Sequence, residues 1–108
     1  MGAAVFFGRV VPMEKKHVAA LATIIEAMPR AAPVELIAEA EWGEDVSRWP
    51  GTWLSITRTR ISQIRRKIEP EGFTIVPIFE VGYRLVPCPS KTRIEAHRLI
   101  QKSIEVRV

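Results

Sequence analysis

The sequence predicts an α+β fold in which three helices are followed by a β-hairpin. Apolar residues recur at spacings of three and four in three consecutive stretches between residues 14 and 68, which is the period of an amphipathic helix. Two β-rich runs follow at 73–78 and 81–86, separated by Phe79-Glu80. With 108 residues, the chain can form one compact core and is too short for a second of comparable size.

The segment before the first helix, residues 1–12, predicts one short strand or a tight hairpin about Gly8-Arg9. It is rich in β-branched and aromatic residues and is interrupted by glycine, which turns accept readily. We therefore divide the chain into this N-terminal flank, a central domain at 13–87 and a C-terminal extension at 88–108.

The C-terminal extension is predicted to be helical. After Pro87 and Pro89, Ser90 can cap a last helix that continues to about Glu105. Its apolar residues are less regularly spaced than those of the other helices: Ile94, Leu99, Ile100 and Ile104. We expect this helix to pack on the domain or on a second copy of the chain, so a homodimer is left open.

The first two helices of the domain are delimited by proline and glycine. The first begins at Glu14 and ends soon after Met28, because Pro29 cannot continue it. Its apolar face comprises Val18, Leu21, Ala22, Ile25 and Met28. The second begins at Pro33, which suits a first helical turn, and ends at Gly43. The apolar stripe of this second helix is Val34, Ile37, Ala38 and Trp42, and the acids of the helix are expected to face solvent.

The third helix is the longest and is rich in basic residues. It stops at Glu69-Pro70-Glu71-Gly72, and its predicted seam is Leu54, Thr57, Ile61, Ile64 and Ile68. From Ala31 to Ser47 the chain has five acids and no base, whereas from Arg48 to Ile68 it has six bases and no acid. The net charge of the chain is +4, and its positive charge is concentrated in this element, as expected of a protein with a polyanionic partner.

The hairpin completes a recognisable layout. Two helices joined by a turn, of which the second is basic here, followed by a β-hairpin are typical of a winged helix-turn-helix. Pro77 restricts its strand to a sheet edge or a bulge, and Gly82-Tyr83 is expected to shape the hairpin, with Tyr83 on the core. The predicted fold is therefore an α+β winged helix-turn-helix with a three-helix core, a C-terminal β-hairpin wing, a short N-terminal strand or hairpin and an extra C-terminal helix.

The run ISQIRRKIEPEGFTIVPIFEVGYRL, from Ile61 to Leu85, resembles the OmpR/PhoB-type winged-helix effector domain of bacterial response regulators. That family ends its third helix with I-S-x-L-R-x-K-L and E-x-x-G, and closes its hairpin on V-G-Y-R. The first pattern falls here on Ile61, Ser62, Ile64, Arg65, Lys67 and Ile68, and the second on Val81, Gly82, Tyr83 and Arg84. Upstream, PVELIAEAEWGEDV at 33–46 is similar to the family's second helix with its terminal W-G, so the resemblance covers roughly residues 14–86.

The resemblance implies a DNA-binding transcription regulator, with three departures from the family. The hairpin tip is Phe79-Glu80 where the family often has arginine followed by glycine, and an acid there repels phosphate. Arg58 stands where the family usually has an acid, so the base preference does not transfer. The chain has no room for a receiver domain, and we expect no control by aspartyl phosphorylation within it.

The residue types on the third helix favour double-stranded DNA independently of the resemblance. A helix in the major groove needs donors and acceptors toward the base edges and cations toward the phosphates. We expect helix 51–69 to place Arg58, Ser62, Gln63 and Arg66 toward the bases, with Ser55 and Thr59 beside them. For the sugar-phosphate backbone we expect Arg60, Arg65 and Lys67, with Arg84 of the hairpin for a further phosphate.

A second function stays open: a winged-helix module that binds another regulator or RNA polymerase. Its contacts would come from the acidic second helix, the Phe79 tip and the loop at 44–53. Exposed tryptophans are frequent interface anchors. Trp53 is expected to cover the core, so Trp49 is the better candidate for contacting a partner.

The sequence contains no recognisable catalytic or metal-binding constellation. The serines lack a histidine and an acid in a suitable arrangement, and Cys88 has no second cysteine. His17 and His97 are expected at the surface or at an edge, without metal-site spacing. We therefore expect no enzymatic activity, no metal and no cofactor. No apolar run is long enough to span a bilayer, which together with the lone cysteine predicts a cytoplasmic protein without a membrane partner.

Overall fold

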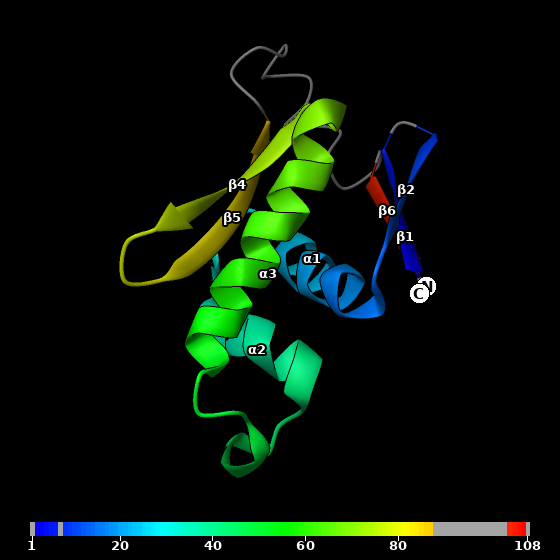
Figure 1. Ribbon diagram of the computed structural model, residues 1–108. Helices are drawn as coiled ribbons and strands as arrows, with labels where there is room; N and C mark the ends of the chain where they lie inside the picture. The colour runs from blue at the N-terminus through cyan, green and yellow to red at the C-terminus, as the bar shows by residue number, and fades with distance from the viewer. Residues whose placement is uncertain (1, 7, 88–103, 108) are drawn as a thin grey trace.

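The protein has an α+β architecture in the residues that its computed structural model describes, 2–6, 8–87 and 104–107. The helices are α1 (Lys15–Ala27), α2 (Val34–Trp42) and α3 (Trp53–Ile68). One antiparallel sheet contains β1 (Gly2–Phe6), β2 (Arg9–Met13) and β6 (Ile104–Arg107), and the other contains β3 (Ala32–Pro33), β4 (Phe73–Ile78) and β5 (Gly82–Pro87). Figure 1 shows α3 in front of α1 and α2, with the β4–β5 hairpin on one side and the sheet of β1, β2 and β6 on the other.

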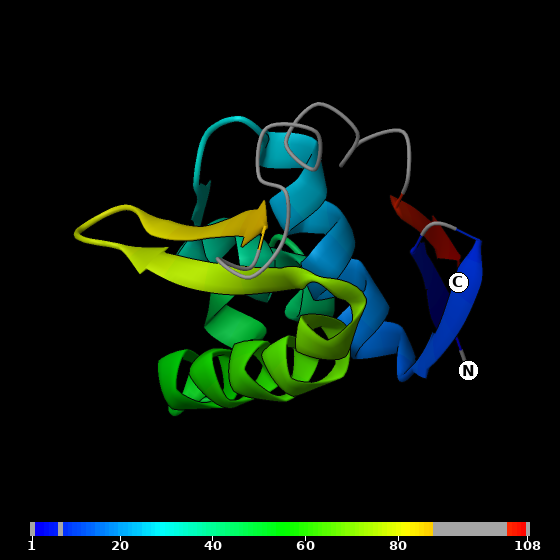
Figure 2. The same ribbon diagram turned by 90° about the horizontal axis from the view of Figure 1, so that it is seen from above.

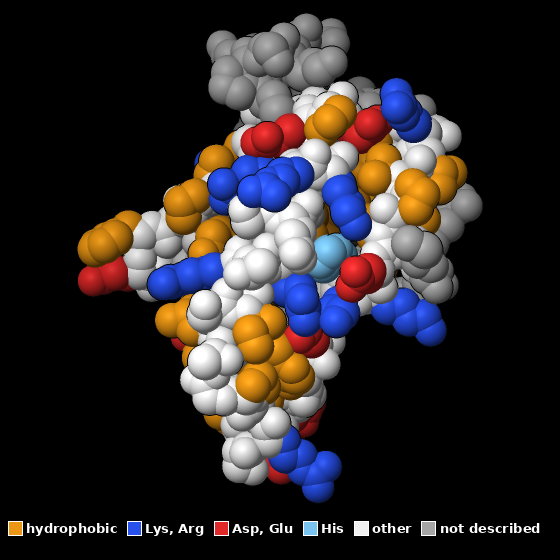
Figure 3. Space-filling view, in the orientation of Figure 1, with side chains coloured by type: hydrophobic (Ala, Val, Ile, Leu, Met, Phe, Trp, Pro, Cys, Tyr) orange, Lys and Arg blue, Asp and Glu red, His pale blue; other side chains and the backbone are white. Residues whose placement is uncertain are grey.

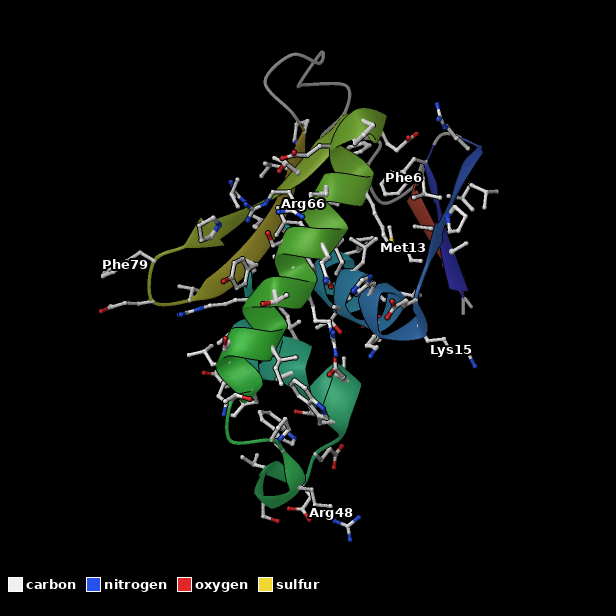
Figure 4. All side chains as sticks on the ribbon, viewed as in Figure 1. Phe6, Met13, Lys15, Arg48, Arg66 and Phe79 are labelled. Carbon is white, nitrogen blue, oxygen red and sulfur yellow. The ribbon has the colours of Figure 1, made fainter. Side chains whose placement is uncertain are left out.

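The N-terminal segment forms a hairpin, one of the two forms that its sequence predicts. β1 and β2 pair antiparallel from Gly2 opposite Met13 to Phe6 opposite Arg9. Gly8 adopts a φ of 85° in the turn, a conformation that glycine accepts at low cost. Phe6 and Met13 are buried and lie between this sheet and the helices in Figure 4. The N-terminal flank is therefore part of the core.

The prediction of a C-terminal helix is wrong at the end of the extension. Ile104–Arg107 is strand β6, which pairs antiparallel with β1 from Phe6 opposite Ile104 to Ala3 opposite Arg107. Residues 88–103, with most of the predicted helix, lie outside the described residues. β1 offers an edge that β2 does not cover, and the alternation of apolar and charged residues in I-E-V-R suits a strand on that edge.

The helices begin and end close to the predicted residues. α1 has Glu14 at its N-cap, and α2 lies between Pro33 and Gly43. The buried stripe of α1 differs from the predicted one: it is His17, Val18, Ala20, Leu21 and Ile24, whereas Ala22, Ile25 and Met28 are half-buried. The stripe is displaced because α1 contacts α2, α3 and strands of both sheets, and this wider contact face is centred on residues 17–24.

The predicted seam holds α3 to the rest of the molecule. Thr57, Ile61, Ile64 and Ile68 are buried, and Leu54 in the first turn is half-buried. The isoleucines pack in a core with residues of α1, such as Leu21, and of the hairpin, such as Leu85. Seen from above in Figure 2, α3 lies at the outside of the molecule, so its opposite face is turned to solvent.

The β4–β5 hairpin forms where the sequence predicts it. The two strands pair from Phe73 opposite Pro87 to Ile78 opposite Gly82, with the turn at residues 79–81. β5 is the central strand of its sheet and β4 is an edge, so the expectation that Pro77 lies on an edge strand is confirmed. In Figure 2 the turn of the hairpin projects well beyond the helices.

The two-residue strand β3 was not predicted. It pairs with β5 and places Ala32 opposite Tyr83 and Pro33 opposite Gly82. Because β3 lies in the connection between α1 and α2, this pairing attaches the start of β5, next to the hairpin turn, to that connection. Tyr83 packs against the core, as its position in the sequence predicts.

Candidate nucleic-acid interface

The outward face of α3 is polar and positively charged. Since the seam faces the core, the side chains on the opposite side of the helix reach solvent: Ser55, Arg58, Thr59, Gln63 and Arg66 are all exposed. Figure 3 views this face and shows Lys and Arg side chains gathered over α3 and beside the hairpin. No acid occurs between residues 48 and 68, so α3 itself carries no negative charge to offset these cations.

The other predicted site residues are partly buried at the flanks of this face: Arg60, Ser62, Arg65 and Lys67 on α3, and Arg84 on β5. Contacts with neighbouring elements distinguish the two flanks of the helix. Arg60 bonds to α2, which marks one flank, whereas Arg58 lines a groove toward the hairpin, which marks the other. The positions of the helical wheel place Arg65 and Ser62 on the hairpin flank with Arg58, and Lys67 on the same flank as Arg60.

A groove of about 430 Å³ separates the first half of α3 from the hairpin. Arg58 lies on its helical side, and Pro77, Phe79 and Tyr83 lie on its hairpin side. Phe79, at the tip, is 88% exposed and points away from the molecule in Figure 4. The groove therefore has a cation on its helical side and an apolar tip on its hairpin side, and two acids, Glu35 and Glu80, also line it.

Arg60 is already paired with an acid of the neighbouring helix, and its predicted role as a phosphate contact stays a prediction. Its Nε donates a hydrogen bond to Oε1 of Glu41 at 2.8 Å, and its Nη2 donates to Oε2 at 3.3 Å. This two-bond ion pair joins α3 to α2, and the hydrogen bond raises the pKa of Arg60. Glu41 is correspondingly half-buried, although the acids of its helix were expected to face solvent. The partner is 19 residues distant, so helical periodicity cannot reveal it.

The other basic side chains of the candidate interface differ from Arg60 in this respect. Within the described part of the chain, no ion pair engages any of Arg58, Arg65, Arg66, Lys67 and Arg84. The Nε atoms of Arg65 and Arg84 are also buried without a hydrogen-bond partner among those residues. The hydroxyl of Thr59 is used inside the helix, where it donates to the carbonyl of Ser55 at 3.1 Å.

Gln63 makes a contact that the sequence did not predict. Its Oε1 lies 2.9 Å from Nε2 of His17 on α1. His17 is 3% exposed, so the expectation of a surface or edge position is wrong. Burial is the largest cause of a pKa of His17 below its ordinary value of 6.5, so the ring is neutral at pH 7. The spacing of His17 to Leu21 and Ile24, four and seven residues, would have placed it on their buried face.

The loop between α2 and α3 is held by tryptophan rings. Nε1 of Trp49 donates to the carbonyl of Gly43 at 2.8 Å. Its ring lies edge-on to Trp53, with centroids 5.2 Å apart, and 6.3 Å from the ring of Trp42. Trp49 and Trp53 are both half-buried. Trp49 thus shapes the loop through its N–H group, and a contact between its ring and a partner stays a prediction.

No metal site or membrane span is found in what the structure describes. No three His, Cys, Asp or Glu side chains lie close enough together there to hold a metal ion, and Cys88 and His97 fall outside the described ranges. None of the helices α1, α2 and α3 is long and apolar enough to cross a membrane.

Comparison of the chain with known protein families, with curated proteins and with solved structures found no match. The resemblance of its third helix and hairpin to the OmpR/PhoB-type domain therefore stays a prediction.

Proposed function

We propose that the protein is a winged helix-turn-helix transcription regulator that binds double-stranded DNA with α3 in the major groove. The observation that carries the proposal is the outward face of α3, where exposed polar side chains are flanked by three cations without an ion pair to a described acid: Arg65, Lys67 and Arg84. With 16 residues, α3 is about 24 Å long, enough to contact several base pairs in a groove that is roughly 12 Å wide.

The order and placement of the elements support the winged-helix part of the proposal. α2 and α3 are joined by a loop, and α3 is followed by a hairpin that projects beside it (Figure 1). In helix-turn-helix proteins the second helix of the pair enters the groove. The groove between α3 and the hairpin would then lie against the DNA, with the hairpin as the wing.

The side chains divide into two roles in this proposal. Arg58 and Arg66 reach the base edges together with Gln63, because all three side chains are exposed to solvent on α3. Arg65, Lys67 and Arg84 at the flanks bind phosphates, which positions the helix without reading sequence. A transcription regulator must reach the chromosome, so the proposal includes the cytoplasmic location that is expected from the sequence.

A salt titration of two matched variants tests the proposal. Arg65→Ala removes a cation without an ion partner among the described residues, and Arg60→Ala removes one that is bound to Glu41. On random duplex, Arg65→Ala should reduce the slope of log affinity against log salt by about one, because roughly one counterion is released for each phosphate contact. Arg60→Ala should leave the slope nearly unchanged and lower the melting temperature instead.

The result that would overturn DNA binding is clear. Wild-type protein that retains neither random duplex at low salt nor any fragment of genomic DNA is not a DNA-binding protein. If duplex is retained and both variants reduce the slope equally, α3 is not oriented as proposed. Circular dichroism of each variant confirms that the fold is intact.

One observation favours the alternative of a protein-interaction module. Phe79 is 88% exposed at a tip that also carries Glu80, and an apolar ring beside an acid suits a protein partner better than a phosphate backbone. RNA polymerase or another regulator would be such a partner. Phe79→Ser should then weaken binding to that protein and leave the affinity for duplex unchanged.

A further inference from the structure

Gln63 differs from its neighbours on the outward face of α3 because its side chain is hydrogen-bonded to another helix. Its Oε1 lies 2.9 Å from Nε2 of His17, a residue that is 3% exposed. Arg58 and Arg66 on the same face have no such link to described residues. The orientation of the Gln63 amide is therefore determined by the core.

The hydrogen bond fixes which part of the amide reaches solvent. A glutamine amide has an oxygen that accepts and an NH₂ group that donates. Because Oε1 lies next to a buried ring, the oxygen is turned toward the protein. The NH₂ group of Gln63 is left on the outer side, where a ligand of α3 would lie.

The protonation of His17 agrees with this orientation. Oε1 can only accept, so Nε2 of His17 must carry the proton, and a neutral imidazole then has none on Nδ1. Nδ1 is buried and has no hydrogen-bond partner among the described residues. An inverted Gln63 amide would require the proton on Nδ1, as a buried N–H without an acceptor.

We infer that His17 is a positioning residue that presents Gln63 to DNA as a hydrogen-bond donor. Gln63 would then select guanine, whose O6 and N7 both accept, or the O4 of thymine. Recognition of adenine by two bonds needs the amide oxygen to accept from N6, and His17 already holds that oxygen. The inference rests on the proposed function, in which α3 lies in the major groove.

Selection of bound sequences from a random duplex library tests the inference. Gln63→Met first identifies the base pair at which preference depends on Gln63, and the wild type should prefer guanine or thymine there. Gln63→Lys, which can only donate, should keep that preference, whereas Gln63→Glu, which can only accept, should lose it. The measured quantity is the ratio of affinities between duplexes that differ at this base pair, because Lys and Glu also change the affinity for every sequence.

His17 is tested by the same ratio. His17→Phe removes the donor and keeps a ring in the core, so it should let Gln63 accept adenine and reduce the discrimination against adenine about five- to tenfold. His17→Gln, which retains a donor, should restore part of the discrimination. A purely structural role of His17 would lower the affinity for all duplexes equally and leave the ratio unchanged. Nitrogen NMR of the wild-type ring should find the proton on Nε2.

The outcomes separate this inference from the proposed function. Preference for adenine at the identified base pair, loss of preference in Gln63→Lys, or an unchanged ratio in a folded His17→Phe would overturn the inference. If His17→Phe does not fold, the Gln63→Lys and Gln63→Glu pair decides. If duplex is bound but Gln63→Met alters no preference, the inference fails while DNA binding stands. If wild type binds no duplex, both fail.

Discussion

His17 joins the core to the candidate interface. Its ring is buried in α1 and bonds to the exposed Gln63 of α3. The charged groups that act on it are Lys67 and Arg60, which oppose its protonation, and Glu14, which favours it. Burial is the largest effect and favours the neutral ring.

We predict that the protein loses stability as the pH falls below about 6.5, the ordinary pKa of histidine. The pKa of His17 is lower in the folded than in the unfolded chain, so the unfolded chain takes up the proton first. The neutral ring makes its full contribution to the free energy of unfolding above the pKa that His17 has in the unfolded chain. This contribution declines as the pH falls through that pKa and levels off below the pKa of His17 in the folded chain. Melting temperatures of wild type and His17→Phe over this range measure the effect. Parallel curves for the two proteins would contradict it.

Among the basic residues of α3, helical periodicity predicted which ones face outward and could not predict which ones are engaged. Arg58 and Arg66 are exposed, as their distance from the Ile61 and Ile64 seam requires. Arg60 is an arginine like Arg58 and lies on the same side of the helix as Lys67. It is nevertheless bound to Glu41 of another helix. Such a contact depends on how α2 packs against α3, and the spacing of residues within one helix does not predict that packing.

Among the elements, the pairing of β3 with β5 determines how the hairpin is attached. The two backbones approach closely at Gly82, where an added Cβ would lie 1.9 Å from the carbonyl oxygen of Ala32 and 2.9 Å from Cα of Pro33. Only a residue without a side chain fits between these strands. The glycine in the V-G-Y-R segment thus has a structural reason that is independent of DNA.

We predict that Gly82→Ala lowers the free energy of unfolding by about 2–4 kcal/mol, because the clash is with backbone and cannot be relieved by a side-chain rotation. Gly51→Ala is the control, since no atom lies within 4 Å of a Cβ at that position. Urea denaturation followed by circular dichroism compares the two. Equal midpoints for the two variants would show that β3 separates from β5 at little cost.

Elements with strong local signals were predicted, and elements defined by their partners were not. Pro33 and Gly43 marked the ends of α2, and the β-rich runs marked β4 and β5. The short β3 and β6 exist through their pairing with β5 and β1, which brings together residues that are distant in sequence. The capping signal at Ser90 favoured a helix through about Glu105, whereas Ile104–Arg107 is a strand.

Over the whole molecule, the sheet of β1, β2 and β6 is tied to the rest of the core by aromatic packing. Phe6 of β1 lies against Phe73 of β4, with ring centroids 5.7 Å apart. Since Phe73 begins the hairpin that follows α3, the N-terminal sheet supports the same region that carries the candidate interface. β6 completes this sheet by pairing with the edge of β1 that β2 leaves open.

We predict that ending the chain at residue 103 destabilises the fold by about 1–3 kcal/mol and promotes self-association, because the edge of β1 loses its partner. Thermal melting and light scattering measure the two effects. The salt slope of DNA binding serves as the control, and it should be unchanged because α3 is not altered. An unchanged melting temperature together with a monodisperse sample would mean that β6 adds nothing to the sheet.

The pairing of β1 with β6 also has a consequence for the order of folding during synthesis. The ribosome makes β1 about a hundred residues before β6, so for most of translation the nascent chain carries a two-stranded hairpin, which is marginal in isolation. The contacts among α1, α2 and α3 span shorter separations and can form earlier. We therefore expect the helical core to form first, and the N-terminal sheet to be completed when β6, the last described element to be made, joins β1.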